Sequence, residues 1–412
     1  MRGKAGLNNE KLQLSNRSLI LGIIVKRGIV SRIELVELTG LGKAAITNIV
    51  NELLEGDIIE ECDKPKKAGQ RKTKGLRIKE GEIHILSVRW MRDCYKASVF
   101  SFSGTMLAKV EAEIPAEEDV RETTNRIFET MDGLIRQFGE DTFLGICVGV
   151  PGPYIRSDGF SRAFVNGYEK LQQVDIQQMF EDHFPCLVLT EHDAHLSAFC
   201  EWANLNRSKN IDCRCLLALQ SIGVGIGAGI VFNGDILEGA FGIAGEIGQI
   251  GIYFNGPKNT YGGRGTLEYY ASSASVRNYV RDRLCEFPDT VLNEGSDYQE
   301  ILAAYEAGDR LAEWAFGMIA WRLAYGLLST IFIINPELIV IEPDYPASEK
   351  FIDKLNESLC KMIDPEIAKR IMIRYSDIPE DTTLQGGYEF TIQYLANDAS
   401  LYERLKEIMR KQ

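Results

Sequence analysis

CLLALQSIGVGIGAGIVFNG, residues 215–234, is the stretch that decides the fold class. It has no charged residue and is long enough to cross a membrane as a helix. Glycine stands at alternate positions from 223 to 229, however, and the residues between are Val224, Ile226 and Ala228. A period of two is typical of a strand. The stretch therefore predicts buried strands and not a membrane helix.

The chain before this stretch alternates between strand and helix patterns. Strands are expected at 83–88, 95–102, 106–110 and 143–150, and a helix at 120–138. The last of these strands ends in Pro151-Gly152-Pro153, and a later one, at 186–189, leads into Glu191-His192-Asp193-Ala194-His195. Such alternation predicts an α/β body whose polar ligand groups collect where strands end.

Charge is divided unevenly along the 412 residues, whose formal net charge is −13. Residues 1–79 hold 16 Lys and Arg against 9 Asp and Glu, so this segment carries +7 and the remaining 333 residues carry −20. The basic segment and the acidic body are expected to bind different partners.

The basic segment has the element order of a winged helix-turn-helix. A first helix is expected at 19–26, and Ser31 with Glu34 forms a capping box that starts a second helix, 31–39. A short turn precedes a third helix, whose apolar stripe ends at Gly56. A basic ribbon follows at 62–79. Each signal alone also fits a solvated helical pair with a charged linker, but their order favours DNA binding.

The face of the third helix opposite its apolar stripe suits the major groove of double-stranded DNA. Its side chains are small or polar, so they can approach base edges and phosphates. The predicted DNA contacts are Lys43, Ala44, Thr47, Asn48 and Asn51 on this helix, and Arg71 and Lys72 on the ribbon.

The composition is that of an ordinary globular protein. With 45% hydrophobic and 25% charged residues, the chain is neither disordered nor a disulfide scaffold. Nine cysteines at irregular spacing, with no apolar segment after Met1, predict reduced thiols and a cytoplasmic location. Cys213 and Cys215 are expected to be strand cysteines and not metal ligands.

Six motifs, in order, make the whole chain resemble the regulator branch of the ROK family (repressors, open reading frames and kinases). They are VGVPGP at 148–153, EHDAH at 191–195, SIGVGIGAGIVFNG at 221–234, GIAGEIGQIGI at 242–252, GGRGTLE at 262–268 and INPELIVI at 334–341. The resemblance implies an actin-like, hexokinase-type (ribonuclease H-like) body of two lobes with a sugar cleft between them. The expected domains are the winged helix-turn-helix at 1–80, a first lobe at 81–190 plus about 385–412, and a second lobe at 191–384.

The resemblance also implies where a ROK kinase would hold ATP, and this sequence departs there twice. The family's Asp-x-Gly-Gly-Thr phosphate loop corresponds to Ser87-Val88-Arg89-Trp90-Met91, which lacks the glycines and the metal-binding carboxylate. The late glycine cluster corresponds to Glu342-Pro343-Asp344. The glycines at 223–229 survive, but close strand packing explains them equally well. Asp193 keeps the position of the catalytic base and is expected to bind a sugar hydroxyl without catalysis.

By the same resemblance, a set of polar side chains would bind the sugar hydroxyls. The set is Asn166, His192, Asp193, Glu246, Gln249 and Glu268. His192 stands where Asn is usual and Gln249 where His is usual, so sugar preference is expected to differ from that of relatives. Taken alone, Asp193 also fits a helix N-cap and Glu246 a solvated loop. His195 is expected to pack as a satisfied histidine outside the site.

Most ROK proteins hold a structural zinc with one His and three Cys. Gln249, Asn259, Tyr261 and Thr266 occupy these positions here, so neither zinc nor another cofactor is expected.

These features predict a sugar-responsive DNA-binding transcriptional regulator, by family default a repressor, that is not an enzyme. Its expected partners are a double-stranded DNA operator and a monosaccharide or sugar-phosphate effector. A homodimer or dimer of dimers would double the DNA site, and no membrane insertion is expected. Two alternatives stay open: an active ROK sugar kinase with an appended DNA-binding domain, and a protein whose body binds a sugar-transport component.

Overall fold

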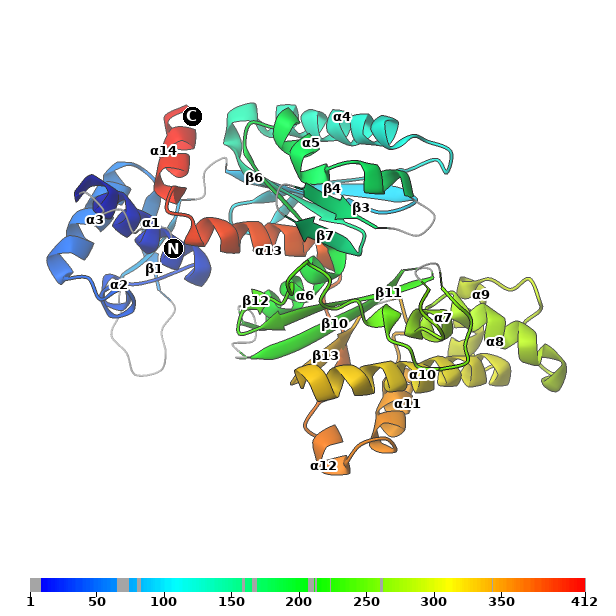
Figure 1. The fold of residues 1–412 in the computed structure, drawn as a ribbon. Helices are drawn as coiled ribbons and strands as arrows, with labels where there is room; N and C mark the ends of the chain where they lie inside the picture. Colours follow the sequence, from blue (N-terminus) through cyan, green and yellow to red (C-terminus); the bar gives the residue numbers. More distant parts are fainter. Residues whose placement is uncertain are drawn as a thin grey trace. The chain divides into compact units, whose positions relative to one another are not determined.

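The computed structural model describes residues 9–64, 74–79, 83–157, 160–164, 169–206, 211, 213–222, 224–259, 262–342 and 344–411. The chain folds into two units (Figure 1). Unit 1 is Met1–Gly149, Ile176–Thr190 and Gly387–Gln412, and unit 2 is Val150–Asp175 and Glu191–Gly386. The division into three domains stays a prediction, because the N-terminal segment groups with the first sheet in unit 1.

The N-terminal head of unit 1, residues 9–79, has three helices and a hairpin. They are α1 (Asn9–Arg27), α2 (Arg32–Thr39), α3 (Lys43–Glu55) and the antiparallel strands β1 (Ile59–Asp63) and β2 (Lys74–Ile78). The predicted capping box of Ser31 and Glu34 is confirmed at the start of α2. Helix α1 begins ten residues before the predicted first helix, since apolar spacing marks only its buried second half, which includes Ile20 and Ile24.

The sheet of unit 1 has the strand order β5-β4-β3-β6-β9. Its strands are β3 (His84–Trp90), β4 (Cys94–Ser101), β5 (Met106–Glu113), β6 (Phe143–Val150) and β9 (Leu187–His192). Strand β3 is antiparallel to β4 and parallel to β6. Helices α4 (Val120–Phe138) and α5 (Ile176–His183) belong to the same unit as this sheet. Helix α4 and strand β6 have the bounds expected from the sequence.

The sheet of unit 2 repeats this order as β12-β11-β10-β13-β14. Its strands are β10 (Cys215–Ile222), β11 (Gly225–Phe232), β12 (Asp235–Ile236), β13 (Leu338–Ile341) and β14 (Met372–Tyr375). The uncharged stretch forms the antiparallel pair β10–β11, so the strand prediction is confirmed. In the sheet of unit 1, β3 pairs antiparallel with β4 and parallel with β6, which follows a helix. In the sheet of unit 2, β10 pairs antiparallel with β11 and parallel with β13, which also follows a helix.

The remaining elements complete the fold around these sheets. They are the hairpin β7 (Tyr154–Ser157) and β8 (Phe160–Ala163), and the helices α6 (Asp193–Asn204), α7 (Leu267–Ala271), α8 (Ser275–Arg283), α9 (Tyr298–Glu306), α10 (Arg310–Ile334), α11 (Glu349–Cys360), α12 (Pro365–Ala368), α13 (Thr382–Asn397) and α14 (Leu401–Lys411). Helix α13 begins in unit 2 and ends in unit 1, and α14 follows it in unit 1.

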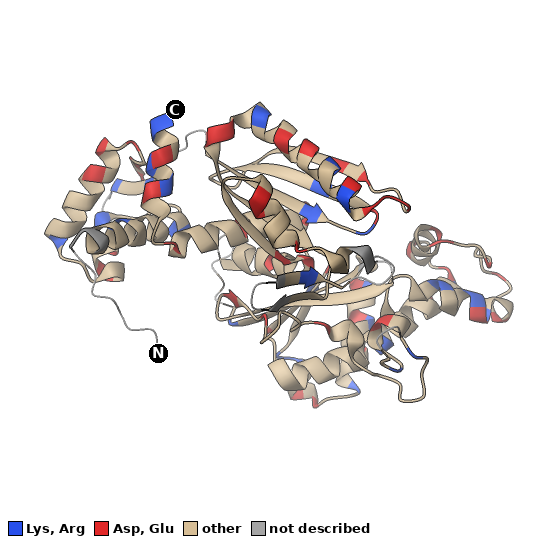
Figure 2. Cartoon of the chain, turned by 45° about the horizontal axis from the view of Figure 1, so that its top comes forward, with Lys and Arg blue, Asp and Glu red and all other residues tan. Residues whose placement is uncertain are grey.

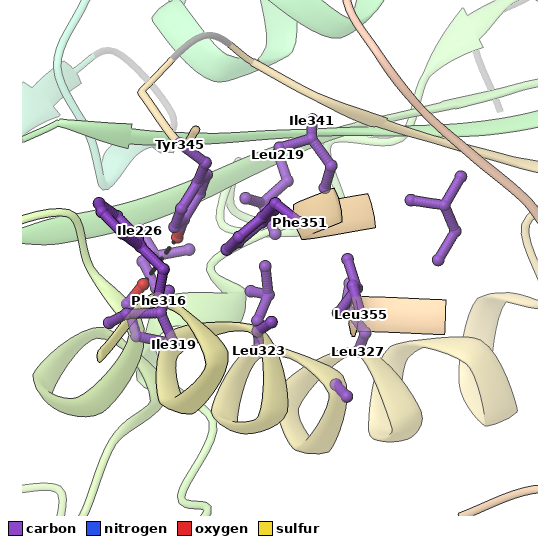
Figure 3. Close-up of a cluster of buried hydrophobic side chains, with 14 of the residues drawn as sticks. Leu219, Ile226, Phe316, Ile319, Leu323, Leu327, Ile341, Tyr345, Phe351 and Leu355 are labelled. Carbon is purple, nitrogen blue, oxygen red and sulfur yellow. Dashed lines mark hydrogen bonds between the residues drawn. The ribbon is translucent and has the colours of Figure 1, made fainter. Parts of the chain in front are cut away.

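The core of unit 2 forms where α10 packs against the sheet (Figure 3). Phe316, Leu323 and Leu327 on α10 are buried with Leu219 of β10 and Ile341 of β13. By length and composition α10 could cross a membrane. Its buried inner face accounts for that apolar composition.

Candidate functional site

His192 and Asp193 stand at the junction of β9 and α6 in unit 2. Helix α6 begins at Asp193, with His192 at the N-cap and no side-chain capping bond there. The Asp193 carboxylate instead accepts a hydrogen bond from Gln220 Nε2 at 3.0 Å, and its Oδ1 lies 3.2 Å from His192 Nε2. All three side chains are buried.

The imidazole of His192 packs against the backbone of Gly152. A Cβ at position 152 would lie 2.1 Å from His192 Nε2, so any side chain there would have to displace the edge of the ring. Burial lowers the pKa of His192 to about 4, and the ring is therefore neutral at pH 7. A single proton on Nε2 can donate to Asp193. This leaves the Nδ1 lone pair facing Glu246 Oε1 at 4.0 Å.

Glu246 stands in the loop just before the short 3₁₀ turn Ile247–Gln249. Its side chain is only 17% exposed, and burial raises its pKa to about 7. Its Oε1 atom is buried without a hydrogen-bond partner among the described residues. A buried polar atom of this kind calls for a partner, and a ligand hydroxyl beside Nδ1 of His192 would supply one.

Glu268, on α7, is close enough to Glu246 to contribute to the raised pKa of that carboxyl. Burial also raises the pKa of Glu268, and a hydrogen bond from the Gln249 side chain opposes this effect. Gln249 Oε1 accepts from Asn259 Nδ2 at 2.7 Å. The site therefore brings two carboxyl groups and an amide together near His192.

The four positions that would hold zinc do not suit that ion. Gln249 and Asn259 bond to each other, Thr266 is a buried hydroxyl, and Tyr261 lies outside the described residues. Zinc prefers thiolate and imidazole ligands. Within the described chain, no three His, Cys, Asp or Glu side chains are grouped so as to hold a metal ion.

Cys215 begins β10, as expected, whereas Cys213 lies before this strand. Burial raises the pKa of both thiols to about 11, so both stay protonated.

His195 lies behind the site, fully buried on α6. Its Nδ1 is 3.0 Å from Glu191 Oε1 and its Nε2 is 2.9 Å from the carbonyl oxygen of Ala244. Burial alone would lower the pKa of His195, but the hydrogen bonds to these two acceptors raise it overall. The hydrogen bond between His195 and Ala244 therefore connects α6 to the loop that carries Glu246.

The structure brings most of the predicted sugar residues into this one region, but Asn166 lies outside the described residues. Sequence reasoning missed Gln220 and Gly152, and it gave Glu191 no role. One signal was available for Gln220, which is the single amide in the apolar strand β10.

The stretch expected to have lost phosphate binding is a paired strand. In the ladder with β4, Arg89 pairs with Lys96 and Trp90 with Tyr95. The N–H of Met91 donates to the carbonyl of Cys94 at 2.9 Å, and Trp90 is fully buried.

Glu342 and Asp344, at the second departure from the kinase pattern, make hydrogen bonds within the protein. Glu342 accepts from the hydroxyls of Ser197 at 2.6 Å and Thr382 at 3.1 Å, and burial raises its pKa to about 7. Asp344 Oδ2 accepts from the backbone N–H of Ser221 at 3.1 Å. Pro343 lies outside the described residues.

The predicted DNA-reading face of α3 is exposed. Its opposite face is buried through Ile46, Val50 and Leu53. The exposed residues include all five predicted contacts on this helix: Lys43, Ala44, Thr47, Asn48 and Asn51. Arg71 and Lys72 lie outside the described residues.

Positive and negative residues are mixed over the chain (Figure 2), and cations of the hairpin have carboxylate partners. Lys74 pairs with Glu61 at 2.5 Å and Arg77 with Glu60 at 2.6 Å. The described part of the hairpin is therefore less positive than its Lys and Arg content suggests.

Two sheets of one strand order, with buried carboxyl and imidazole groups after a strand end, define an α/β protein with a repeated sheet. The sequence model of the ROK family matches residues 86–391, and the chain belongs to this family. A xylose repressor from Caldicellulosiruptor bescii is 26% identical over 366 residues, which cover 85% of this chain and 88% of the relative.

Two solved structures show the same fold. A ROK family transcriptional regulator, described as a homolog of the E. coli MLC protein, has a TM-score of 0.78 with 23% identity, over 96% of this chain and all of the other. A ROK glucokinase from Streptomyces griseus, in complex with glucose and AMPPNP, has a TM-score of 0.60 with 19% identity, over 74% of this chain and 98% of the other. The fold alone therefore does not separate regulators from kinases.

Proposed function

We propose that this protein is a sugar-responsive transcriptional repressor whose head binds an operator in double-stranded DNA. The head is the winged helix-turn-helix, with α3 as the reading helix and the hairpin β1–β2 as the wing. Its support is the exposed polar face of α3, together with a relative named as a xylose repressor. A homodimer presents two heads to a two-fold site in the cytoplasm.

The effector site is the group of His192, Asp193, Glu246, Gln249 and Glu268, completed by Asn166. Its chemistry suits a monosaccharide or its phosphate. Neighbouring carboxyl and imidazole groups can bond two adjacent hydroxyls each, and Glu246 Oε1 is a buried acceptor without a protein partner among the described residues.

We further propose that the body does not catalyse phosphoryl transfer, and one observation carries this. Arg89 and Trp90 of strand β3 are paired with residues of β4. A kinase of this family needs glycines at these positions, so that the backbone can wrap the phosphates. By the family resemblance the nucleotide would pass Glu342 and Asp344, whose carboxyl groups already accept hydrogen bonds within the protein. A sugar can still bind, because the Asp193 carboxylate can accept a hydrogen bond from a sugar hydroxyl in the absence of ATP.

The competing function is a ROK sugar kinase with an appended DNA-binding domain. Asp193 at the catalytic-base position and the glucokinase of the same fold are the observations that favour it. A body that binds a sugar-transport component is a third reading, and no contact among the described residues favours it over free sugar.

One set of measurements separates these functions. Purified full-length protein is screened by thermal shift with xylose, glucose, N-acetylglucosamine and their phosphates, and the wild-type protein selects duplexes from a random-sequence DNA library. We expect one sugar to raise the melting temperature and to change the affinity for an enriched inverted repeat. ATP-dependent phosphorylation of that sugar at a turnover above about 1 per second, a typical kinase rate, would instead establish the enzyme.

A further inference from the structure

The C-terminal helix α14 is built into the N-terminal head. It lies beside α1 (Figure 1), and its Leu401 and Leu405 are fully buried. The Ser18 hydroxyl of α1 donates to the carbonyl of Ala399 at 2.7 Å and accepts from the N–H of Tyr402 at 3.3 Å. Segments more than 380 residues apart in the chain therefore form one packed unit.

A side-chain cluster extends this contact to the DNA-reading helix. Arg17 of α1 donates two hydrogen bonds to the Glu52 carboxylate of α3, at 2.9 and 2.7 Å. The Tyr402 hydroxyl donates to the same carboxylate at 3.2 Å, and the Arg17 guanidinium lies 5.4 Å above the Tyr402 ring. Glu52 is next to Asn51 and one turn after Asn48, so the cluster sets the rotation of the face that carries both amides.

Helix α13 begins at the proposed effector site. The Thr383 hydroxyl in its first turn donates to the backbone carbonyl of Asp193 at 3.3 Å. Gly386 packs so closely on α6 that a Cβ there would lie 2.0 Å from the carbonyl oxygen of Leu196. The first turn of α13 is thus seated on the helix whose N-terminus carries Asp193, and these contacts lie within unit 2.

The last turn of the same helix is seated on the head, through contacts within unit 1. A Cβ at Gly22 of α1 would lie 2.0 Å from the carbonyl oxygen of Ala396. Lys26 donates to Asn397 Oδ1 at 2.8 Å. The chain passes from unit 2 to unit 1 within α13, between Gly386 and Gly387.

We propose that α13 and α14 transmit the effector signal to the reading helix, with Arg17 and Tyr402 as positioning residues for α3. This inference rests on the proposed function. A sugar at Asp193 displaces the start of α6, the seated first turn of α13 follows, and α14 changes the position of α3 through Glu52. Such a link requires that the two ends act on one equilibrium.

The test uses two conservative variants of the full chain, Thr383→Val and Tyr402→Phe, which remove one hydroxyl at each end of the link. The readout is the ratio of affinities, with and without the active sugar, for the duplex enriched by the wild-type protein. Coupled sites typically show a ratio of about 5 to 150. We expect each variant to reduce the ratio at least threefold, and the double variant to reduce it no further than one single variant does.

The matched control is Tyr394→Phe, which removes the hydroxyl of a half-exposed tyrosine of α13 and should keep the wild-type ratio. Melting temperatures and sugar affinities of all variants are measured in parallel. Wild-type ratios in both single variants, or multiplicative losses in the double variant, would overturn the link. If the wild-type protein itself enriches no duplex or responds to no sugar, the proposed function fails instead.

Discussion

Burial sets the charge states of the proposed effector site residue by residue. His192 is neutral because its pKa is lowered to about 4, whereas the pKa of Glu246 is raised to about 7. The two side chains face each other at 4.0 Å, so Glu246 changes protonation near neutral pH beside a neutral imidazole. Sugar affinity is therefore expected to depend on pH around 7.

Glu246→Gln should stabilise the protein at alkaline pH. The folded-state pKa of about 7 lies above the usual value of 4.5, so the folded state binds more protons between these values and wild-type stability falls as pH rises through this window. We expect the variant to exceed wild type by on the order of 1–3 kcal/mol at pH 8 and to match it near pH 4.5. Urea unfolding at both pH values measures this difference.

The control for this series is Glu117→Gln, an exposed carboxyl outside the site. Its unfolding free energy should follow the wild-type pH dependence throughout. A Glu246→Gln protein whose unfolding free energy also follows that dependence would show that Glu246 is ionised in the same way in both states.

At acidic pH, His195→Gln should destabilise the protein by about 3–5 kcal/mol, because the buried Glu191 would lose its cationic partner. The raised pKa of His195 makes its contribution complete below the unfolded value of about 6.5, and the contribution is lost as pH rises through the folded value. The deficit should therefore shrink in alkali. Lys354→Gln, which removes the exposed ion pair with Glu357, should cost less than about 1 kcal/mol. Equal losses in both variants would contradict this.

At the scale of elements, the packing of α6 on β11 explains the glycine-rich strand. A Cβ at Gly229 would lie 2.1 Å from the carbonyl oxygen of Ala194 and 2.5 Å from Ala198 Cβ. Gly229→Ala should therefore cost about 1–3 kcal/mol. In Gly133→Ala the new methyl meets open space within α4. The higher helix propensity of Ala should therefore raise the free energy of unfolding by about 0.5–1 kcal/mol. Thermal unfolding of both variants checks the opposite signs.

Local sequence patterns predicted the elements well where neighbours along the chain decide them. The capping box of Ser31, the bounds of α4 and the strands β10 and β11 follow from spacing and turn chemistry. The first half of α1 did not follow, because its residues lack the apolar spacing that marks the buried half. The Gln220 bond to Asp193 joins residues 27 apart in sequence, which no local pattern encodes.

At the scale of the whole molecule, resemblance supplied what local chemistry could not. Motif matching named His192, Asp193 and Glu246, and the structure places them together in unit 2. Neither motif nor composition pointed to α14 as part of the head. Its contacts with α1 span more than 380 residues of sequence, and the pairing of Arg17 with Glu52 becomes visible only once the chain is folded.

Charge segregation leads to the last prediction. We expect this protein of net charge −13 to bind DNA through its basic segment, residues 1–79, so affinity for the enriched duplex should fall steeply with salt. Lys43→Ala on the exposed face of α3 should reduce the slope of log affinity against log salt by about 1. Lys369→Ala, at an exposed ion pair on unit 2, should leave the slope unchanged. Identical slopes for wild type and Lys43→Ala, measured by fluorescence anisotropy, would remove Lys43 from the interface.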